Sequence, residues 1–292
     1  MNIPARIDLN SDIGELTSVP LDRYRASEMA VDNRKSSTRG NFGSSRAQNE
    51  PGLIRDGLID GGSDGLIMQL VSSVNISCGV HAGSIELTQR TIENAARAGV
   101  AVGAHPGMPG QFGRSDDLID PEHAFVEITR QLGQFQSIAA ACGVVVSHVK
   151  PHGALYNQAE TNIRIAEAIV HAVQQTIPQA KIFGLAGKQL LSVAAERGLS
   201  TVGEFFADRA YEADGNLRSR LKPSAVYDDP EFVARRAAEA VQTGSVIAAD
   251  GSILKIEFET ICVHGDSAHA LEILNLLHST LIASSVRIER PE

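Results

Sequence analysis

The stretch "SHVKPHGALYN", residues 147–157, places His148, Lys150 and His152 at every second position. Successive side chains of an extended strand point to opposite faces, so these three share one face while Val149 lies on the other. The whole chain has only nine histidines. This concentration therefore predicts a strand with one polar and one apolar face.

Other short segments alternate in the same way. They are "RIDLNSDIG" (6–14), "VNISCGVH" (74–81), "VGAHP" (102–106), "EFFADR" (204–209) and "ICVHGD" (261–266). Covering helices would bury the apolar faces, so the polar faces are expected to point inward. The polar residues become denser toward the carboxyl end of each strand, which is where β/α barrels build their active sites. An enzyme cavity at that end is the prediction, although any single histidine has an alternative reading as a buried structural group.

From residue 64 onward, β-rich runs alternate with longer stretches at helical period, such as residues 88–99 and 160–178. With the first strand this makes about seven β-then-α units, which predicts a mainly parallel sheet. We therefore expect an α/β protein in which residues 1–292 form one domain, a seven-stranded (β/α) barrel. A doubly wound open sheet is the alternative. Asp250-Gly251 predicts a β-hairpin within residues 245–258, and residues 286–290 are a candidate eighth strand.

Residues 18–63 interrupt this rhythm after the first strand. They are rich in Ser, Arg, Asn and Gly, as in "NRKSSTRGNFGSSRAQNEPG" (33–52), and have no sustained period. A loop of this length is uncommon in a compact domain. The segment is predicted to be a long irregular insertion, either disordered or a lid over the site.

Composition excludes several classes of function. The net charge of −9 provides no basic surplus for nucleic acid, and tryptophan is absent. The three cysteines have no metal-site spacing, which favours a reducing compartment. Neither a signal peptide nor an apolar run of membrane length is evident. We expect a cytoplasmic protein without a membrane partner.

Six motifs, in order along the chain, resemble the LamB/YcsF family, to which the A-type subunit of 5-oxoprolinase belongs. They are "IDLNSDIGE" (7–15), "VNISCGVHAGS" (74–84), "VGAHPGMPGQFGR" (102–114), "SHVKPHGALYN" (147–157), "EFFADRAYEADGNLRSR" (204–220) and "ICVHGDSAHA" (261–270). The resemblance implies ATP-dependent opening of 5-oxoproline (pyroglutamate) to L-glutamate together with partner subunits B and C. It also implies a seven-stranded barrel of the glycoside hydrolase/deacetylase type. The chain departs from the family pattern at residues 18–63, where family members have a short loop.

Opening a lactam requires a base for water, an acid for the departing nitrogen, and positive charge for phosphate and carboxylate. The candidate catalytic residues are Asp12, Glu15, His81, His105, Lys150 and His152. The candidate substrate-binding residues are Asn10, Asn75, Arg114, Tyr156, Asp208, Arg209, His264 and Asp266. An internal ion pair of Lys150 with Asp12 or Asp208 is the structural alternative for these charged groups.

The nucleotide site is not evident from the sequence. "FGLAGKQ" (183–189) lacks the Gly and the Ser or Thr that a phosphate loop requires at positions 182 and 189, so we interpret it as a strand-to-helix turn. The ATP contacts are then expected on, or shared with, the partner subunits.

A metal-dependent hydrolase or deacetylase acting on a small polar or carbohydrate substrate is the main alternative function, and a non-catalytic metabolite-binding subunit is another. Whether a divalent cation is bound stays open at this point. His148 and His152 would lie roughly 13 Å apart on a strand, too far for one ion. His81, His105 and Asp12, from separate strands, make a better ligand set.

Overall fold

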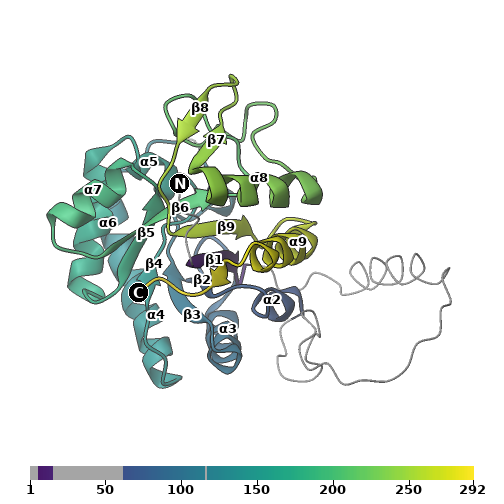
Figure 1. Cartoon of the computed structure of the whole chain (residues 1–292). Coiled ribbons are helices and arrows are strands. Elements are labelled where there is room, and N and C mark those ends of the chain that lie inside the picture. The colour runs from purple at the N-terminus through teal and green to yellow at the C-terminus, as the bar shows by residue number, and fades with distance from the viewer. Residues whose placement is uncertain (1–5, 16–61, 116) are drawn as a thin grey trace, which may run out of the picture.

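The computed structural model describes residues 6–15, 62–115 and 117–292. Its centre is a closed barrel in which every neighbouring pair of strands is parallel, with β9 hydrogen-bonded to both β6 and β1 (Figure 1). The barrel strands are β1 (Arg6–Ile13), β2 (Ser73–Ser77), β3 (Ala101–His105), β4 (His148–Val149), β5 (Lys181–Leu185), β6 (Thr201–Phe206) and β9 (Thr260–His264). The prediction of a seven-stranded β/α barrel is confirmed, and the open sheet is excluded because β1 and β9 pair.

Helices surround the barrel and bury the apolar faces of its strands (Figure 1). They are α2 (Gly62–Ile67), α3 (Ile85–Ala98), α4 (Pro121–Ala141), α5 (Gly153–Ala159), α6 (Ile163–Thr176), α7 (Gln189–Glu196), α8 (Pro230–Thr243) and α9 (Ala270–Ala283), with a 3₁₀ turn η1 (Gln111–Gly113). Local chemistry explains the helix ends. Asp120 and Asp229 cap α4 and α8, each of which has proline in its first turn. None of the described helices combines the length and the hydropathy that a membrane crossing requires.

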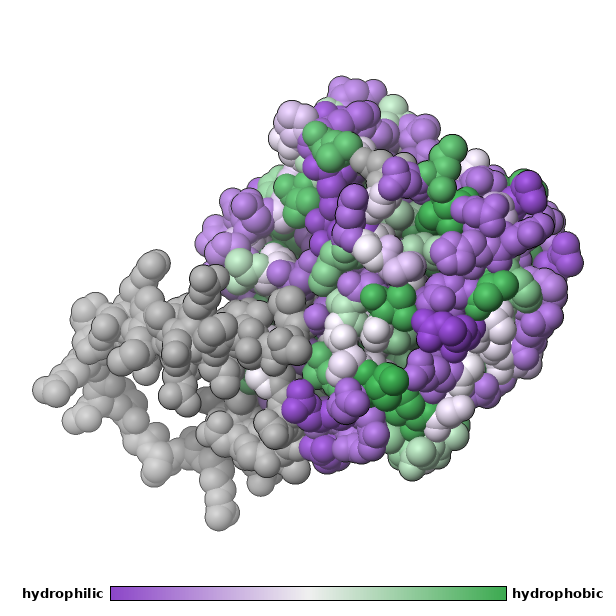
Figure 2. All heavy atoms as spheres, turned by 180° about the vertical axis from the view of Figure 1, so that it is seen from behind, coloured by the Kyte–Doolittle hydropathy of each residue, from purple (hydrophilic) through white to green (hydrophobic). Residues whose placement is uncertain are grey.

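The remaining strands lie outside the barrel. The predicted hairpin is confirmed, because β7 (Ser245–Ile247) pairs antiparallel with β8 (Ile253–Lys255). Among the described strands, the candidate eighth strand, β10 (Arg287–Ile288), pairs with the amino end of β1 alone and is not part of the closed barrel. The insertion predicted at residues 18–63 lies outside the described residues, except that Gly62 and Ser63 begin α2. On the face seen in Figure 2, hydrophobic residues lie in small groups between hydrophilic ones.

The barrel interior is polar, as the alternation predicts. Asn10 donates from Nδ2 to Glu204 Oε1 (3.0 Å) and to Thr260 Oγ1 (2.7 Å), and Asn75 Nδ2 donates to Asn10 Oδ1 at 2.7 Å. All of these side chains are buried. Because burying polar groups costs free energy unless they are hydrogen-bonded, this network explains how the barrel tolerates buried polar side chains in its interior.

His148 occupies the interior space that a side chain at Gly103 would need. Its Nε2 lies 2.7 Å from Asn75 Oδ1, and its ring stacks on Phe183 with centroids 4.0 Å apart. A Cβ atom added at Gly103, its register partner on β3, would come within 2.1 Å of that Nε2. Gly103 is therefore required for close approach rather than for an unusual backbone angle.

Substituting Gly103→Ala is expected to lower the free energy of unfolding by about 1–3 kcal/mol. The new methyl group would clash with the His148 ring, which Asn75 and Phe183 hold in place. Urea denaturation measures this loss. Gly133→Ala in α4 is the matched control: its Cβ would meet nothing within 4 Å, so it should be neutral or stabilise by about 0.5–1 kcal/mol. Adding His148→Ala should recover part of the loss in Gly103→Ala. Equal losses in the single and double variants would contradict this account.

Candidate active site at the carboxyl end of the barrel

The predicted catalytic residues lie together at the carboxyl ends of the strands. Asp12 lies near the end of β1, His105 ends β3, and Lys150 directly follows β4. Glu15 is turned toward them by Gly14, which adopts φ 73° and donates its N–H to Asp64 of α2 at 2.9 Å. The other members are His81, in the loop after β2, and His152, the N-cap of α5. All six predicted catalytic side chains are buried.

Lys150 lies at the base of the site inside an ion-pair network. Its Nζ is 2.9 Å from both Asp12 Oδ1 and Glu204 Oε1, and it donates to Cys262 Sγ at 3.0 Å. Burial alone would lower the pKa of Lys150, but Asp12, Cys262 and Glu204 raise it well above its usual value. Likewise, burial would raise the pKa of Asp12, but the Lys150 ammonium holds it well below its usual range. Lys150 is therefore charged, and the predicted ion pair with Asp12 is confirmed.

Glu204 was not among the predicted site residues, although its inward position on β6 was a signal for it. It also accepts a hydrogen bond from the Tyr156 hydroxyl at 3.0 Å. The alternative pairing of Lys150 with Asp208 does not occur, because Asp208 binds His264 instead.

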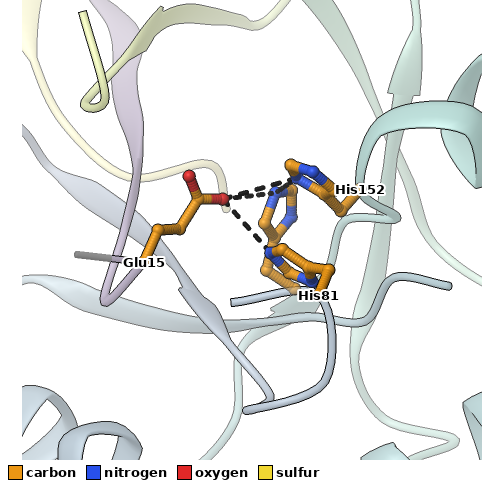
Figure 3. A group of neighbouring side chains, drawn as sticks. Glu15, His81 and His152 are labelled. Carbon is orange, nitrogen blue, oxygen red and sulfur yellow. Dashed lines mark hydrogen bonds and ion pairs between the residues drawn. The ribbon is translucent and has the colours of Figure 1, made fainter. Parts of the chain in front are cut away.

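Glu15, His81, His105 and His152 offer ligand atoms that all lie within 4.8 Å of one another. Glu15 Oε1 is 3.2 Å from His81 Nε2, 3.4 Å from His152 Nδ1 and 3.9 Å from His105 Nε2 (Figure 3). Burial lowers the pKa of His105 to about 3 and that of His152 well below its usual value, so both imidazoles are neutral near pH 7. Three imidazoles and one carboxyl group are a donor set that suits a divalent metal ion.

This group differs from the ligand set expected from the sequence. His81 and His105 belong to both, but Glu15 and His152 take the place of Asp12, which lies 3.6 Å from His105 Nε2 and is held by Lys150. His148 turns away from the group toward Asn75, in agreement with the prediction that it does not share an ion with His152.

His148 also makes stability depend on pH. Burial lowers the pKa of His148 to about 3, with Lys150 nearby adding to the effect. In the unfolded chain a histidine is protonated near pH 6.5, whereas in the native protein His148 is protonated only near pH 3. Its contribution to the free energy of unfolding is therefore complete above about pH 6.5 and is lost as the pH falls toward about 3.

Between pH 7 and pH 5, the wild type should lose about 2 kcal/mol of unfolding free energy relative to His148→Gln. Urea denaturation of both proteins at several pH values measures this difference. The exposed His123 supplies the control variant His123→Gln, which should follow the wild type. Parallel curves for the wild type and His148→Gln would contradict the prediction.

Asp208 and His264 form a second hydrogen-bonded pair at the same end of the barrel. His264 Nδ1 donates to Asp208 Oδ2 at 2.8 Å, and the His264 main-chain N–H donates to the same oxygen at 3.2 Å. Burial would raise the pKa of Asp208, but its interactions with His264 lower it. Because an ionised carboxylate only accepts, Nδ1 carries a ring proton, which leaves Nε2 as the nitrogen that can act as a general base.

A cavity of about 270 Å³ opens above these groups. Its walls include Asp12, His105, Lys150, His152, Tyr156 and His264, together with the arginines Arg114, Arg209 and Arg220. In a chain of net charge −9, three arginines on one cavity mark it as a site for an anion. Arg220 was not predicted; the only sequence signal for it was its place in the motif that ends at residue 220.

The arginines are held in different ways. Arg114 Nη2 donates to Asp266 Oδ2 at 2.8 Å, which brings together two predicted substrate-binding residues. Arg209 donates to the main-chain carbonyl of Ala225 at 3.1 Å, and burial lowers its pKa to about 10, so it stays charged. Asn10 and Asn75 instead lie deeper in the barrel, within the interior hydrogen-bond network.

The fold and the site together define a (β/α)-barrel protein whose polar centre contains the acids, bases and cations of an enzyme. The LamB/YcsF family model matches residues 56–292. The chain therefore belongs to the LamB/YcsF family, which confirms the resemblance in the motifs.

Relatives and a solved structure agree with this assignment. The chain is 40% identical over 235 residues to the 5-oxoprolinase A-type subunit of Tolumonas auensis, which covers 80% of this chain and 94% of the relative. It is 39% identical over 230 residues to the corresponding 5-oxoprolinase subunit of Bacillus licheniformis, covering 78% and 91%. The crystal structure of the lactam utilization protein from Thermus thermophilus superimposes with a TM-score of 0.75 at 32% identity, covering 97% of this chain and 99% of that one.

Proposed function

We propose that this chain is the A-type subunit of an ATP-dependent 5-oxoprolinase and that its barrel cavity is where the lactam ring is opened. The observation that carries the proposal is the cavity itself, in which arginines face buried imidazoles, a carboxylate and a charged lysine. The substrate is assigned from the names of relatives that match over most of their length.

The cavity suits 5-oxoproline in size and charge. At about 270 Å³ it is at the small end of ligand sites, and 5-oxoproline is a single five-membered ring with one carboxylate. A guanidinium binds a carboxylate or a phosphate through paired N–H donors. Arg114 and Arg220, which line the cavity, are the proposed partners of the substrate carboxylate or of a transferred phosphate.

The reaction needs a base for water and a cation near the carbonyl oxygen. His264 is the proposed base, since it lines the cavity and Asp208 holds its Nδ1. Lys150, charged at the cavity floor, is the proposed source of positive charge for the oxygen that becomes negative in the transition state. ATP would activate the amide by phosphorylating its oxygen.

The nucleotide is proposed to be bound mainly by further subunits of types B and C. On this chain, Gly184 lies in β5 and Gly187 lies between β5 and α7, so "FGLAGKQ" spans a strand-to-helix turn as predicted. Leu118, on the cavity wall, is 90% exposed, and Leu221, next to Arg220, is 81% exposed. Large exposed aliphatic side chains beside a cavity favour contact with a partner protein. A cytoplasmic location is part of the proposal and agrees with three unpaired cysteines.

The test is ATP-dependent release of glutamate from 5-oxoproline by this chain, alone and mixed with B- and C-type subunits from the same genome. Turnover in the mixture only is the expected result. An absence of turnover in every combination of folded, associating subunits would contradict the proposal. It would favour the metal-dependent hydrolase instead.

A further inference from the structure

We propose that Glu15, His81, His105 and His152 bind one divalent transition-metal ion, of the zinc, manganese or cobalt class. The inference goes beyond the proposed reaction and does not rest on it. It depends on the direction in which each ligand atom points, on the contacts that orient the rings and on the spacing of the ligand atoms.

Main-chain carbonyls determine which nitrogen of two imidazoles carries the proton. His105 Nδ1 lies 2.7 Å from the carbonyl oxygen of Lys150, and His152 Nε2 lies 2.9 Å from that of Phe112. A carbonyl oxygen only accepts, so the proton is on the nitrogen that faces it in each ring. The other nitrogens, His105 Nε2 and His152 Nδ1, therefore present lone pairs.

These two lone-pair nitrogens face each other at 2.9 Å. With the proton of each ring on its carbonyl side, the two facing nitrogens are the ring atoms available as ligands. Glu15 Oε1 lies 3.4 Å from His152 Nδ1. A cation between these atoms would be bound by both nitrogens and by the Glu15 oxygen. Carbonyls that orient ligating histidines from behind are the usual outer contacts of a metal site.

His81 is the fourth member of the group. Its Nε2 is 3.2 Å from Glu15 Oε1, and its ring stacks on His152 with centroids 3.8 Å apart. Among the described residues its Nδ1 has no hydrogen-bond partner. Glu15 is thus the polar contact that orients a fully buried imidazole, which is an expensive arrangement unless the ring has a further ligand.

The spacing of the ligand atoms fits an ion. Four ligands at about 2.1 Å from a tetrahedral centre lie about 3.4 Å from one another. The contacts of Glu15 Oε1 with His81, His152 and His105 are 3.2, 3.4 and 3.9 Å, and the His105–His152 contact is 2.9 Å. The remaining pairs, His81 with His105 and with His152, lie within 4.8 Å. The four donors are therefore close enough to converge on one ion after the side chains shift.

Glycines keep the loops close to the cluster. A Cβ atom at Gly107 would lie 2.6 Å from His81 Nδ1, and one at Gly113 would lie 2.8 Å from His152 Cδ2. His105 and His152 also line the substrate cavity, whereas Glu15 and His81 lie behind them. An ion held here would supply positive charge at the cavity wall.

The test measures metal on the full chain, purified without chelator or histidine tag. We expect about one ion per chain by inductively coupled plasma mass spectrometry. After treatment with chelator, Zn²⁺ or Mn²⁺ should raise the melting temperature and bind with one-to-one stoichiometry by calorimetry, and Co²⁺ should give visible absorption bands of a nitrogen- and oxygen-ligated ion.

Ligand variants identify the site. His105→Gln and Glu15→Gln should each weaken metal binding by about 100-fold or more, since even outer contacts of a metal site contribute 10- to 100-fold. His148→Gln, a buried histidine outside the cluster, should bind metal like the wild type. Circular dichroism establishes whether each variant is folded. If His105→Gln does not fold, Glu15→Gln still tests the site, because glutamine has nearly the same shape as glutamate.

Two results would overturn the proposal. One is a folded wild type that takes up none of Zn²⁺, Mn²⁺ and Co²⁺ at high micromolar concentration. The other is unchanged affinity in His105→Gln and Glu15→Gln. Because none of these readouts uses 5-oxoproline, a failure here is distinguishable from a failure of the proposed enzymatic function.

Discussion

Lys150→Met is expected to lower the free energy of unfolding by about 3–5 kcal/mol, because it leaves two buried carboxylates without their cation. Lys150 is 1% exposed, and both Asp12 and Glu204 lie 2.9 Å from its Nζ. Methionine fills a similar volume, so the loss reports charge rather than packing. Urea denaturation near pH 7 measures it. The same substitution should abolish turnover, since Lys150 lines the cavity.

Two further variants make this result interpretable. Lys255→Met removes an exposed lysine of the β7–β8 hairpin and should change stability by less than about 0.5 kcal/mol. The triple variant Lys150→Met, Asp12→Asn, Glu204→Gln removes all three charges and should recover part of the stability lost in the single variant. A single-variant loss below about 1 kcal/mol would show that the carboxylates find other compensation.

Asp208→Asn is expected to lower kcat of the assembled enzyme by about 10²- to 10⁴-fold while the protein stays folded. The asparagine keeps the shape of the side chain, but its amide no longer requires the proton to stay on His264 Nδ1. In part of the molecules the ring proton is then on Nε2, and this nitrogen has no lone pair to receive a proton from water. Steady-state kinetics of 5-oxoproline turnover with ATP and partner subunits measures the effect.

The control for this prediction is Asp250→Asn in the exposed hairpin turn, which should leave kcat unchanged. Separate values of kcat and KM distinguish the possible roles of the Asp208–His264 pair. A fall in kcat with little change in KM supports a base oriented by Asp208. A raised KM with unchanged kcat would instead assign Asp208 and His264 to substrate binding and would contradict the proposed base.

The count of about seven β-then-α units predicted the barrel. The two-residue alternation along six of the strands predicted the end at which the candidate residues lie. Asp8, Asn10 and Asp12 face inward because side-chain direction in a strand is a local property with a period of two. The same reasoning placed His105 and Lys150 at the carboxyl end. The hairpin at Asp250-Gly251 was predictable for a similarly local reason, since its turn residues tolerate the required backbone angles.

The sequence by itself thus determined the strands, their polar faces and the collection of candidate residues. Which of those residues contact one another depends on barrel closure and on loop conformation. Neither leaves a periodic pattern in the sequence. Closure places Glu204 of β6 against Lys150, and the turn at Gly14 brings Glu15 to His81. The loop that carries Arg220 reaches the cavity from residues far beyond any strand end. Distances of about 3 Å between residues of different strands follow from register, closure and turn geometry, so only the tertiary structure decided which side chains act together.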